Sequence, residues 1–371
     1  MVSAGRKGRR AKTLGGDVCF VRSVAECPAC RRSVAVVDIE LGLACGENLT
    51  RGVRRRVAYA AAVSSFSDTE RMLKELSDLD VSRAQCARVA EQEGKRLDQD
   101  RRMREQQWVA PVRCEARVAP AEFECERLVL EADAACVLTV AGEEHKSVYN
   151  AVAFDCGARG RKETNGRPYL SEKRYTASAV DMEDFGGCLK ALANRMGMRQ
   201  AREVAFVADG APPLWKWAED NLPQQTVQIQ DYWHVCEHLS HLAQDLYGPG
   251  ERCAQTVSAW KAALRSSRLD QIVSQLKDEH KRRRGAKRTR LEQEINYLRA
   301  GRHRMDYARY EAQGWPIGSG AVEATCKHLV KQRMCITGAH WRRSKIPPII
   351  ALRLSIFNNE WENAWDHLAL N

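Results

Sequence analysis

Residues 204–210, Val-Ala-Phe-Val-Ala-Asp-Gly, decide the fold, because this short apolar run ends abruptly in an aspartate and a glycine. Such a run, closed by a turn-forming pair, is typical of a buried β-strand. Strand-like and helix-like segments alternate on both sides of it. The strand-like segments are residues 127–140, 146–154, 174–180 and 227–229, and the helix-like segments are residues 185–196 and 215–220. This order predicts an α/β fold built on a mixed sheet.

The segment before the sheet, residues 51–104, has a helical pattern. Ser67 and Asp68 are residues typical of a helix start, and Ser82 is a candidate cap for a second helix. A polar break at residues 77–80 separates the two. We therefore predict two helices joined by a short turn.

The second of these helices directs small apolar side chains inward, namely Cys86, Val89 and Ala90. The opposite side carries Arg83 and Arg88. A helix, a short turn and a capped second helix resemble a helix-turn-helix, whose second helix contacts the DNA major groove. Any small helical bundle shows the same pattern, so DNA contact and simple packing both remain open here.

The segment after the sheet has no strand signal between residues 235 and 313, and we expect long helices there. A glycine-rich loop at residues 314–320 follows. A final helix is then predicted from Ala321 to about Arg333.

Composition excludes several classes of protein. The chain has 371 residues, of which 44% are hydrophobic and 29% are charged, the balance of a folded, water-exposed protein. Apolar runs stay well below membrane-spanning length, and no apolar segment of a secretory signal follows the basic N-terminus. The 14 cysteines show no pairing rhythm, which favours free thiols in a reducing cytoplasm.

Positive charge is concentrated in two zones. The net charge is +11, while residues 1–56 hold 12 Lys and Arg against 5 Asp and Glu, and residues 277–290 hold 8 against 2. Two basic zones on a nearly neutral body are typical of a protein that binds a polyanion such as DNA. In the second zone the candidate DNA-binding residues are Arg282, Arg283, Arg284, Lys287 and Arg288, with Arg302 and Arg304 beyond it.

Cysteines near the N-terminus suggest a zinc knuckle. Cys27 and Cys30 have the spacing at which two thiolates from one turn occupy half of a tetrahedral zinc site. Cys19 and Cys45 are candidates for the other half, although their spacing fits no standard pattern. Structural zinc in a degenerate zinc-ribbon-like segment and ordinary thiols are the two alternatives.

Carboxylates terminate the strands. Asp133 and Asp209 each follow an apolar run, and Glu323 lies one turn into the last predicted helix. Three hard oxygen donors that converge from two strands and a helix would suit Mg²⁺. Asp155, which is also predicted to end a strand, is the alternative to Asp133. Taken singly, each aspartate is better explained as a turn former or a helix cap than as a metal ligand.

Four motifs carry a resemblance to a known family. They are LVLEADA at 128–134, VADGAPPLWKW at 207–217, IQDYWHVCEHL at 229–239 and GWPIGSGAVEATCKHLVKQRM at 314–334. With them, residues from about 45 onward resemble DDE transposases of bacterial insertion sequences, of the Kra-type group. These are relatives of Mutator-like transposases with an RNase H-like core.

The resemblance implies a catalytic triad of Asp133, Asp209 and Glu323 that binds two Mg²⁺ ions, or Mn²⁺ in their place. It implies hydrolysis of phosphodiesters and strand transfer at insertion-sequence ends. Its implied partners are the ends and a target DNA, bound by a homo-oligomer without any membrane, in the bacterial cytoplasm with the nucleoid.

The resemblance also organises the chain. Residues 1–50 form the basic zinc-ribbon-like segment, and 51–125 form the helical DNA-binding region. The RNase H-like core comprises 126–235 and the Glu-bearing helices 317–371, separated by a helical insertion at 236–316. Two departures from the family are the single Cys-x-x-Cys pair and Ala134, where the family more often has glycine.

Other residues of these motifs have two interpretations each. Asp231 and His234 resemble a short signature beside the active site of Mutator-like relatives, or they form a hydrogen-bonded strand-to-helix turn. Lys327 and Lys331 follow Glu323 by four and eight residues, so they lie near its helix face and either clamp DNA phosphates or are simply solvated.

Two competing functions remain at this stage. Residues 234–238, His-Val-Cys-Glu-His, also match the H-x-x-E-H signature of a group of zinc metalloproteases, in which two histidines share a helix face. Alternatively, the chain is a transposase-derived DNA-binding protein that has lost activity.

Overall fold

The computed structural model describes residues 1–43, 48–109, 119–157, 159–161, 168–170 and 172–366. Within these ranges the chain is a mixed α/β protein with two compact units. The first unit comprises Met1–Arg104, Val137–Lys146 and His328–Asn371, and the second comprises Glu105–Cys136 and Ser147–Lys327. The predicted segment 317–371 is thus divided between the two units. None of the described helices combines the length and apolar character that crossing a bilayer requires.

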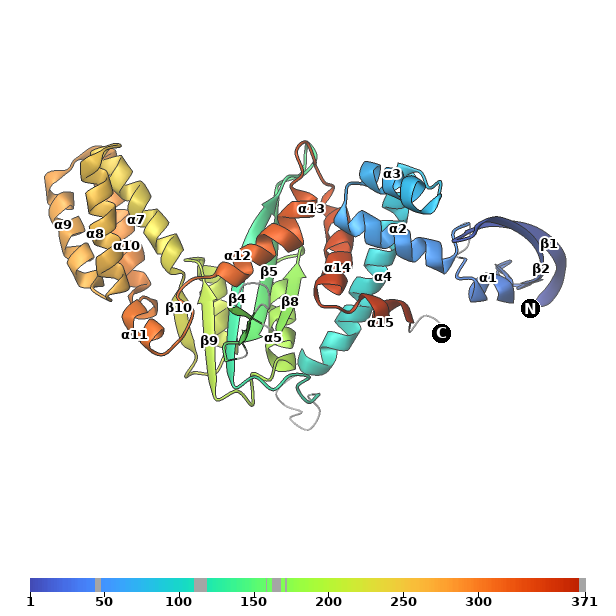
Figure 1. Cartoon of the computed structure of the whole chain (residues 1–371), viewed down its shortest axis with the longest axis horizontal. Helices are drawn as coiled ribbons and strands as arrows, with labels where there is room; N and C mark the ends of the chain where they lie inside the picture. Colours follow the sequence, from blue (N-terminus) through green and yellow to red (C-terminus); the bar gives the residue numbers. More distant parts are fainter. Residues whose placement is uncertain (44–47, 110–118, 158, 162–167, 171, 367–371) are drawn as a thin grey trace. The chain divides into compact units, whose positions relative to one another are not determined.

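The second unit contains the main sheet, which has five strands in the described part of the chain (Figure 1). Its order is β10-β9-β4-β5-β8. The strands are β4 (Arg127–Val137), β5 (Lys146–Asp155), β8 (Lys173–Ser178), β9 (Glu203–Ala208) and β10 (Val227–Gln230). Strand β9 is parallel to both β4 and β10, whereas β5 and β8 are antiparallel. The predicted mixed sheet is confirmed, and its three parallel strands end at the same edge.

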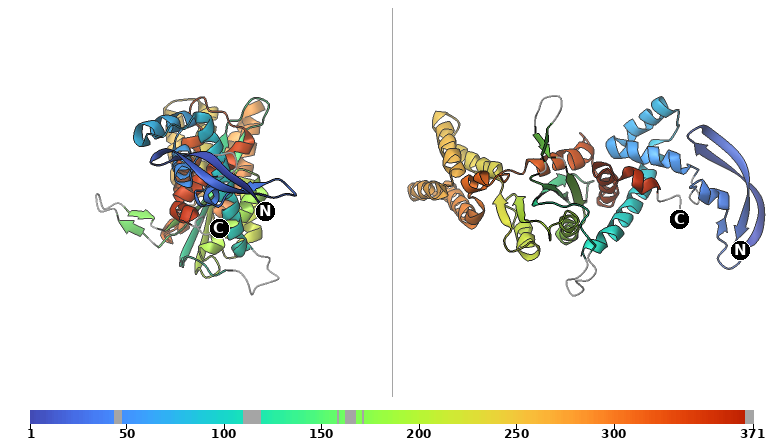
Figure 2. Two further views of the ribbon diagram at one scale, coloured as in Figure 1. Left: turned by 90° about the vertical axis from the view of Figure 1, so that its right-hand side faces the viewer. Right: turned by 60° about the horizontal axis from the view of Figure 1, so that its bottom comes forward.

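Alternation along the strands gives the sheet two apolar faces. Val129, Val207 and Ile229 belong to one buried cluster, and Leu130 and Phe206 belong to the other. The second face is covered by α5 (Met182–Arg195) and α6 (Pro212–Asn221). The first face is covered by α12 (Gly320–Thr325) and the start of α7 (Tyr232–Tyr247), so that α5 and α12 lie on opposite sides of the sheet (Figure 2).

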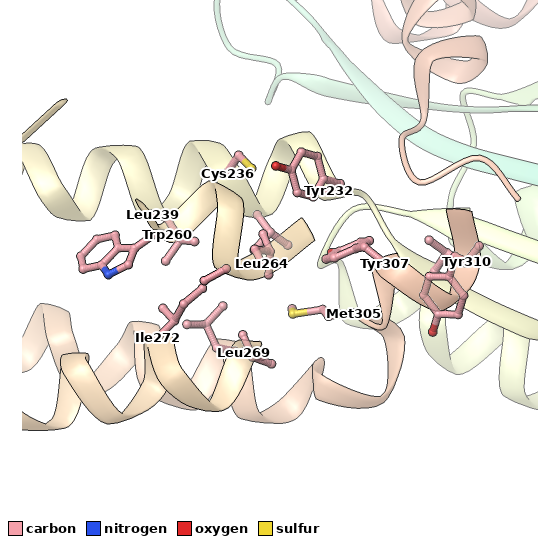
Figure 3. Close-up of a cluster of buried hydrophobic side chains, with 14 of the residues drawn as sticks. Tyr232, Cys236, Leu239, Trp260, Leu264, Leu269, Ile272, Met305, Tyr307 and Tyr310 are labelled. Atoms are coloured by element: carbon pink, nitrogen blue, oxygen red, sulfur yellow. The ribbon is translucent and has the colours of Figure 1, made fainter. Parts of the chain in front are cut away.

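A helical insertion connects β10 to α12, as the sequence predicted. Its helices are α7, α8 (Glu251–Arg265), α9 (Leu269–Arg282), α10 (Gly285–Ala300) and α11 (Tyr307–Ala312), with a short 3-10 turn η2 (Arg302–Arg304). Leu239, Trp260 and Ile272 pack in its core, which continues through Met305 and Tyr307 to the end of β10 (Figure 3). The Tyr307 hydroxyl donates to the Gln230 carbonyl at 2.9 Å, which joins this core to the sheet.

The first unit begins with a long β-hairpin. It consists of β1 (Val2–Thr13) and β2 (Gly16–Glu26), to which β3 (Ser33–Val34) pairs, and α1 (Val36–Glu40) follows. The sequence did not predict this hairpin, because glycines and charged residues interrupt its apolar alternation. A small separate pair, β6 (Arg159–Arg161) and β7 (Pro168–Leu170), lies in the second unit.

The helices predicted for residues 51–104 are present. They are α2 (Arg51–Val63), α3 (Phe66–Ser77) and α4 (Arg83–Val109). The start of α3 was predicted two residues late, since its cap is Ser65, whose hydroxyl accepts the Asp68 N–H. Ser82 does cap α4, because its hydroxyl accepts the Gln85 N–H at 3.4 Å. Cys86, Val89 and Ala90 are fully buried, as expected.

The last helix is interrupted by a π-helical segment. Helix α12 continues into η3 (Cys326–Lys331), which has π geometry, and α13 (Gln332–Met334). A π turn leaves carbonyls without their usual helical donors. The buried Arg353 of α14 (Ile346–Phe357) donates to the carbonyl oxygens of His328 and Leu329, and so satisfies them. A short turn η4 (Arg343–Lys345) precedes α14, and α15 (Trp361–Asp366) follows it.

Candidate active site

The site is built on the two central parallel strands. Ala132 of β4 lies opposite Ala208 of β9, so the next residues, Asp133 and Asp209, lie side by side. Asp209 directly follows β9, but Asp133 does not end its strand as expected, because β4 continues to Val137. Asp133 is half-buried, and its carboxylate accepts the Ala134 N–H at 2.6 Å. Asp209 accepts the Ala211 N–H at 3.0 Å, which shapes the turn into α6. The structure therefore brings these two predicted residues together.

The charges at this edge act on one another. Burial raises the pKa of Asp209, and the negative charges of Asp133 and Asp231 raise it further. The Ala211 N–H and the nearby His234 act in the opposite direction. A carboxyl group held among like charges gains stability from a cation. The electrostatics of the site therefore suit a positively charged ligand.

Glu323 reaches the same region from α12. Val322, its neighbour, donates its N–H to Oε2 of Glu131 at 2.8 Å. Glu131 is two residues before Asp133 on β4 and projects from the same side of the sheet. The exposed Glu323 carboxylate contributes to the raised pKa of Glu131. The Glu-bearing helix is thus attached to the Asp-bearing strand.

Glu131 itself was missed by the sequence analysis. It is only 1% exposed, and burial raises its pKa to about 8, although the N–H groups of Val322 and Ala321 favour its ionised form. The Glu-x-Asp spacing on β4 was the signal that places both side chains on one face. Glu131 holds the start of α12 in position.

A second attachment joins the same two elements. The Cys326 thiol donates to Oδ2 of Asp133 at 3.1 Å. Asn150 of β5, which is fully buried, donates to Cys326 Sγ at 2.9 Å and to the Asp133 carbonyl at 3.3 Å. No sequence pattern pointed to Asn150, because only the pairing of β5 in the sheet brings it next to Asp133. Cys326 and Asn150 fix the orientation of the Asp133 carboxylate.

Asp231 is a structural cap in this arrangement. It is 2% exposed, and its Oδ1 accepts the His234 N–H at 2.7 Å at the start of α7. Its Oδ2 accepts both the N–H and the hydroxyl of Ser319, just before α12. The hydrogen-bonded turn proposed as one interpretation of this pair is therefore present. His234 remains close enough to Asp209 to influence its pKa.

The insertion also contacts the site. The Tyr297 ring of α10 lies over Gly210, where a Cβ atom would stand 2.7 Å from Cε2 of the ring. Gln230 donates to the Tyr297 hydroxyl at 2.6 Å. His238 stacks on Tyr297 with ring centroids 4.3 Å apart, and its Nδ1 is 3.4 Å from the Glu294 carboxylate. In the H-x-x-E-H segment, His238 is therefore engaged in packing.

Asp155 lies at the other end of the sheet. Its Oδ2 accepts the Glu126 N–H at 3.0 Å, and the next residue, Cys156, donates its N–H to the Arg127 carbonyl. Glu126 and Arg127 stand at the beginning of β4, whereas Asp133 is the seventh of its 11 residues. The structure does not bring Asp155 to the other two aspartates.

The donor chemistry of the site fits Mg²⁺ or Mn²⁺. Asp133, Asp209 and Glu323 offer the hard carboxylate oxygens that these ions prefer. Burial is the main cause of the raised pKa of Asp209, and the negative charges of Asp133 and Asp231 that add to it are charges that a cation would neutralise. Among the described residues, no group of three or more His, Cys, Asp or Glu side chains is already arranged around one point.

The second basic zone lies at the turn between α9 and α10. Arg282, Arg284 and Arg288 are exposed there. Arg283 forms an ion pair with Glu279 at 3.0 Å, and Lys287 donates to the Leu246 carbonyl at 3.2 Å. The first three side chains thus project into solvent, and those of Arg283 and Lys287 hold the turn in place.

Arg304, which we expected to contact DNA, is buried instead. Its side chain donates to Glu219 and Gln228, both at 2.7 Å, and lies over the Trp215 ring. It packs the insertion against α6 and β10. Arg302 is exposed and pairs with Asp270 at 2.6 Å.

The remaining predicted DNA-binding side chains are exposed. They are Arg83 and Arg88 on α4 and Lys327 and Lys331 in the π segment. At the N-terminus, hydrogen bonds from the backbone of Cys30 and Ala29 lower the pKa of the Cys27 thiol, as in a metal knuckle. Cys45 lies outside the described residues, and the described ones include no group that completes a zinc site.

Comparison with known proteins gives no match: no protein-family model fits the sequence, and no curated protein is significantly similar to it. The four motifs quoted above nevertheless fall on the elements that form this site. They are β4, the β9–α6 turn, the β10–α7 turn, and α12 with its preceding loop.

Proposed function

We propose that this chain is a DDE-type DNA transposase with an RNase H-like core, which cleaves and joins phosphodiesters at the ends of an insertion sequence. Its partners would be those ends and a target DNA, bound by a homo-oligomer that holds two ends together. It would act in the bacterial cytoplasm, at the nucleoid.

One observation carries the proposal. The adjacent parallel strands β4 and β9 bring Asp133 and Asp209 next to each other. The helix that bears Glu323 is attached to β4 through Glu131 and Cys326. The strand order β8-β5-β4-β9-β10, with the first three connected in sequence, is the order expected of an RNase H-like sheet. Two exposed basic surfaces add the charge that a DNA substrate requires.

The chain's own residues would do the following. Asp133 and Asp209 hold divalent ions from the sheet, and Glu323 completes their ligands from α12. A bound pair of such ions supplies Lewis acidity that activates the attacking oxygen and stabilises the leaving 3′ oxygen. Glu131, Asn150 and Cys326 orient the ligands.

The reaction then needs no protein nucleophile. In the first step, a water oxygen bonds to phosphorus while the bond from phosphorus to the 3′ oxygen breaks. In the second step, the freed 3′ hydroxyl attacks a phosphorus of the target DNA, and another 3′ oxygen leaves. Two successive displacements account for cleavage and joining without a covalent enzyme intermediate.

The test is a cleavage assay on duplex DNA that flanks the gene on either side. Wild-type protein with Mg²⁺ or Mn²⁺ is expected to nick this DNA, and a chelator is expected to stop it. Asp209→Asn and Glu323→Gln should reduce nicking at least a thousandfold while DNA affinity stays within about twofold. Asp155→Asn, at the opposite edge of the sheet, is the matched control and should keep activity.

Each alternative function predicts a different result. DNA binding without any nicking in either metal would support a transposase-derived binding protein. Hydrolysis of a peptide substrate that depends on His234 and Glu237 would support a metalloprotease. Nicking that survives in Asp209→Asn would remove that residue from the catalytic set.

A further inference from the structure

The N-terminal hairpin has one free face. In the antiparallel register, Arg6 pairs with Ser23, Gly8 with Val21 and Arg10 with Cys19. Directly paired residues lie on the same side, so these six positions share one face of the ribbon. On this face Arg10 also forms an ion pair with Asp17 at 2.6 Å. All six are exposed, including 61% of Val21 and 68% of the Arg10 side chain.

The other face of the hairpin is occupied by the chain itself. Arg9 and Arg22 both bind the Asp38 carboxylate of α1, at 2.5 and 2.8 Å. Ala11 and Val24 are buried on this side. The ribbon curves around α1, so that the covered face lies on the inside of the curve (Figure 1). The six-residue face is therefore the outer, convex one.

The convex face alternates long cations with small side chains. Arg6 and Arg10 stand on either side of Gly8, with Ser23, Val21 and Cys19 across from them. The pairing register shifts between Ser3 and Arg6, where Gly5 has a φ of +79°. Such an irregularity bends the strand just before this face. A convex strip with charged ends and a small centre can approach a grooved anionic surface closely.

The tip of the ribbon is anchored beside α4. Lys12 Nζ donates to the Asp80 carbonyl at 2.7 Å, and the Lys12 N–H donates to the Asn48 carbonyl. The Asn48 side chain in turn accepts from Gln85 on the first turn of α4 at 3.2 Å. The convex face thus ends next to the helix start that bears the exposed Arg83.

We propose that the convex face of the β1–β2 ribbon binds the major groove of a DNA duplex, as a second reading element beside α4. A two-stranded antiparallel ribbon fits the width of the B-form major groove. The two arginines would contact guanine edges or flanking phosphates, and Gly8 and Val21 would lie against the bases. The narrow major groove of A-form RNA excludes such a ribbon, so the partner is DNA.

This inference deepens the proposed function, since it assigns a recognition surface to the same protein. Its test uses the full chain in a chelator, so that binding is measured without cleavage. In fluorescence anisotropy with a duplex from the flanking DNA, Arg6→Ala/Arg10→Ala is expected to bind about tenfold more weakly than wild type, or worse. The matched control is Arg202→Ala/Lys216→Ala, which removes two exposed cations of the second unit and should change affinity less than twofold.

A second measurement locates the contact without any mutation that could disturb folding. Cys19 lies in the centre of the convex face and is exposed. The Cys19 thiol is alkylated, and the peptide that contains it is followed by mass spectrometry. Its alkylation should slow at least fivefold when duplex DNA is bound. The double Arg variant should lose this protection at equal DNA concentration. The Arg202→Ala/Lys216→Ala control should retain it.

Three outcomes would overturn the inference: wild-type affinity in the double Arg variant, unchanged Cys19 alkylation on bound DNA, or equal affinity for an RNA duplex of the same sequence. Failure of catalysis is separable from these results. A protein that binds through the ribbon but never nicks DNA contradicts the transposase proposal alone, and a protein that nicks DNA with an unprotected Cys19 contradicts the ribbon alone.

Discussion

Glu131 combines two properties that rarely coexist in one side chain. It is buried, which disfavours its charge, and it accepts the N–H groups at the start of α12, which favour that charge. Burial dominates, so its pKa rises to about 8. This carboxyl therefore exchanges its proton near neutral pH while it holds the Glu-bearing helix.

The pH dependence of stability should reflect Glu131. Its pKa is above the unfolded value of 4.5, so the folded chain binds more protons than the unfolded chain between these two values. The contribution of Glu131 to the free energy of unfolding is complete below pH 4.5 and is lost as the pH rises through 8. The loss has a slope of up to about 1.4 kcal/mol per pH unit.

Urea unfolding between pH 5 and pH 9, in a chelator, checks this. Glu131→Gln keeps an acceptor for the Val322 N–H and removes the titration, so its stability should fall less steeply with pH than that of wild type. Parallel curves for the two proteins would show that Glu131 does not titrate in this range.

Divalent ions should stabilise the fold through the same edge of the sheet. A ligand that binds only the folded state raises the free energy of unfolding by RT ln(1 + [L]/Kd), and so raises the melting temperature. We expect millimolar Mn²⁺ to raise the melting temperature by a few degrees. Asp133→Asn/Asp209→Asn should abolish the rise, and Asp155→Asn should retain it. A rise of equal size in all three proteins would locate the ion elsewhere.

At the scale of elements, α4 and α14 of the first unit approach each other closely at Gly94. A Cβ atom on Gly94 would stand 2.2 Å from the Pro348 carbonyl oxygen, so only glycine allows these two helices to meet. Buried ion pairs flank this contact, among them Arg54 with Glu93. The packing of α14 against α4 therefore depends on Gly94.

Gly94→Ala is expected to lower the free energy of unfolding by about 1–3 kcal/mol, because backbone must move to admit the methyl group. The control is Gly187→Ala on α5, where a Cβ meets nothing within 4 Å. Better helix propensity should make that variant up to about 1 kcal/mol more stable. Chemical denaturation measures both, and two variants of equal stability would refute the close contact.

At the scale of the whole molecule, the proposed association with DNA would be governed by charge. Counterion release makes the logarithm of affinity fall linearly with the logarithm of salt concentration, with a slope of about 0.9 per phosphate contacted. Arg282→Ala/Arg284→Ala/Arg288→Ala removes exposed cations from the α9–α10 turn. It should reduce the magnitude of this slope by about 2–3 and weaken binding to all sequences equally.

Anisotropy titrations at several salt concentrations measure the slope, with Lys216→Ala as a control that removes one paired surface lysine. A variant that loses affinity only for the flanking DNA, at an unchanged slope, would instead assign these arginines to base recognition.

Apolar periodicity was sufficient to predict the strands, their helices and the helical insertion, because each has a buried face. The β1–β2 hairpin was missed, since Gly5, Gly8 and the arginines obscure its alternation. Arg304 was misjudged for a different reason. Its partners Glu219 and Gln228 are remote in sequence, and only the folded chain brings them near.

The candidate site was predictable to the same extent. Asp133 and Asp209 were singled out because each follows an apolar run, and the motif resemblance set them in one triad, but the position of Asp133 inside β4 was not predicted. Asp155 also ends a strand, but its strand runs the other way, and a sequence does not reveal strand direction. Glu131 and Asn150 act through pairings that exist only in three dimensions.

The entry and exit of the helical insertion are hydrogen-bonded neighbours: the Tyr232 N–H donates to the Ile317 carbonyl at 2.9 Å, and Asp231 binds Ser319. These hydrogen bonds between the two ends of the insertion therefore set the separation between Asp209 and Glu323, whatever the length of the polypeptide between them. Evolution could therefore lengthen, shorten or exchange the helical insertion as one unit. An engineer could replace it with a different helical domain without moving the three carboxylates.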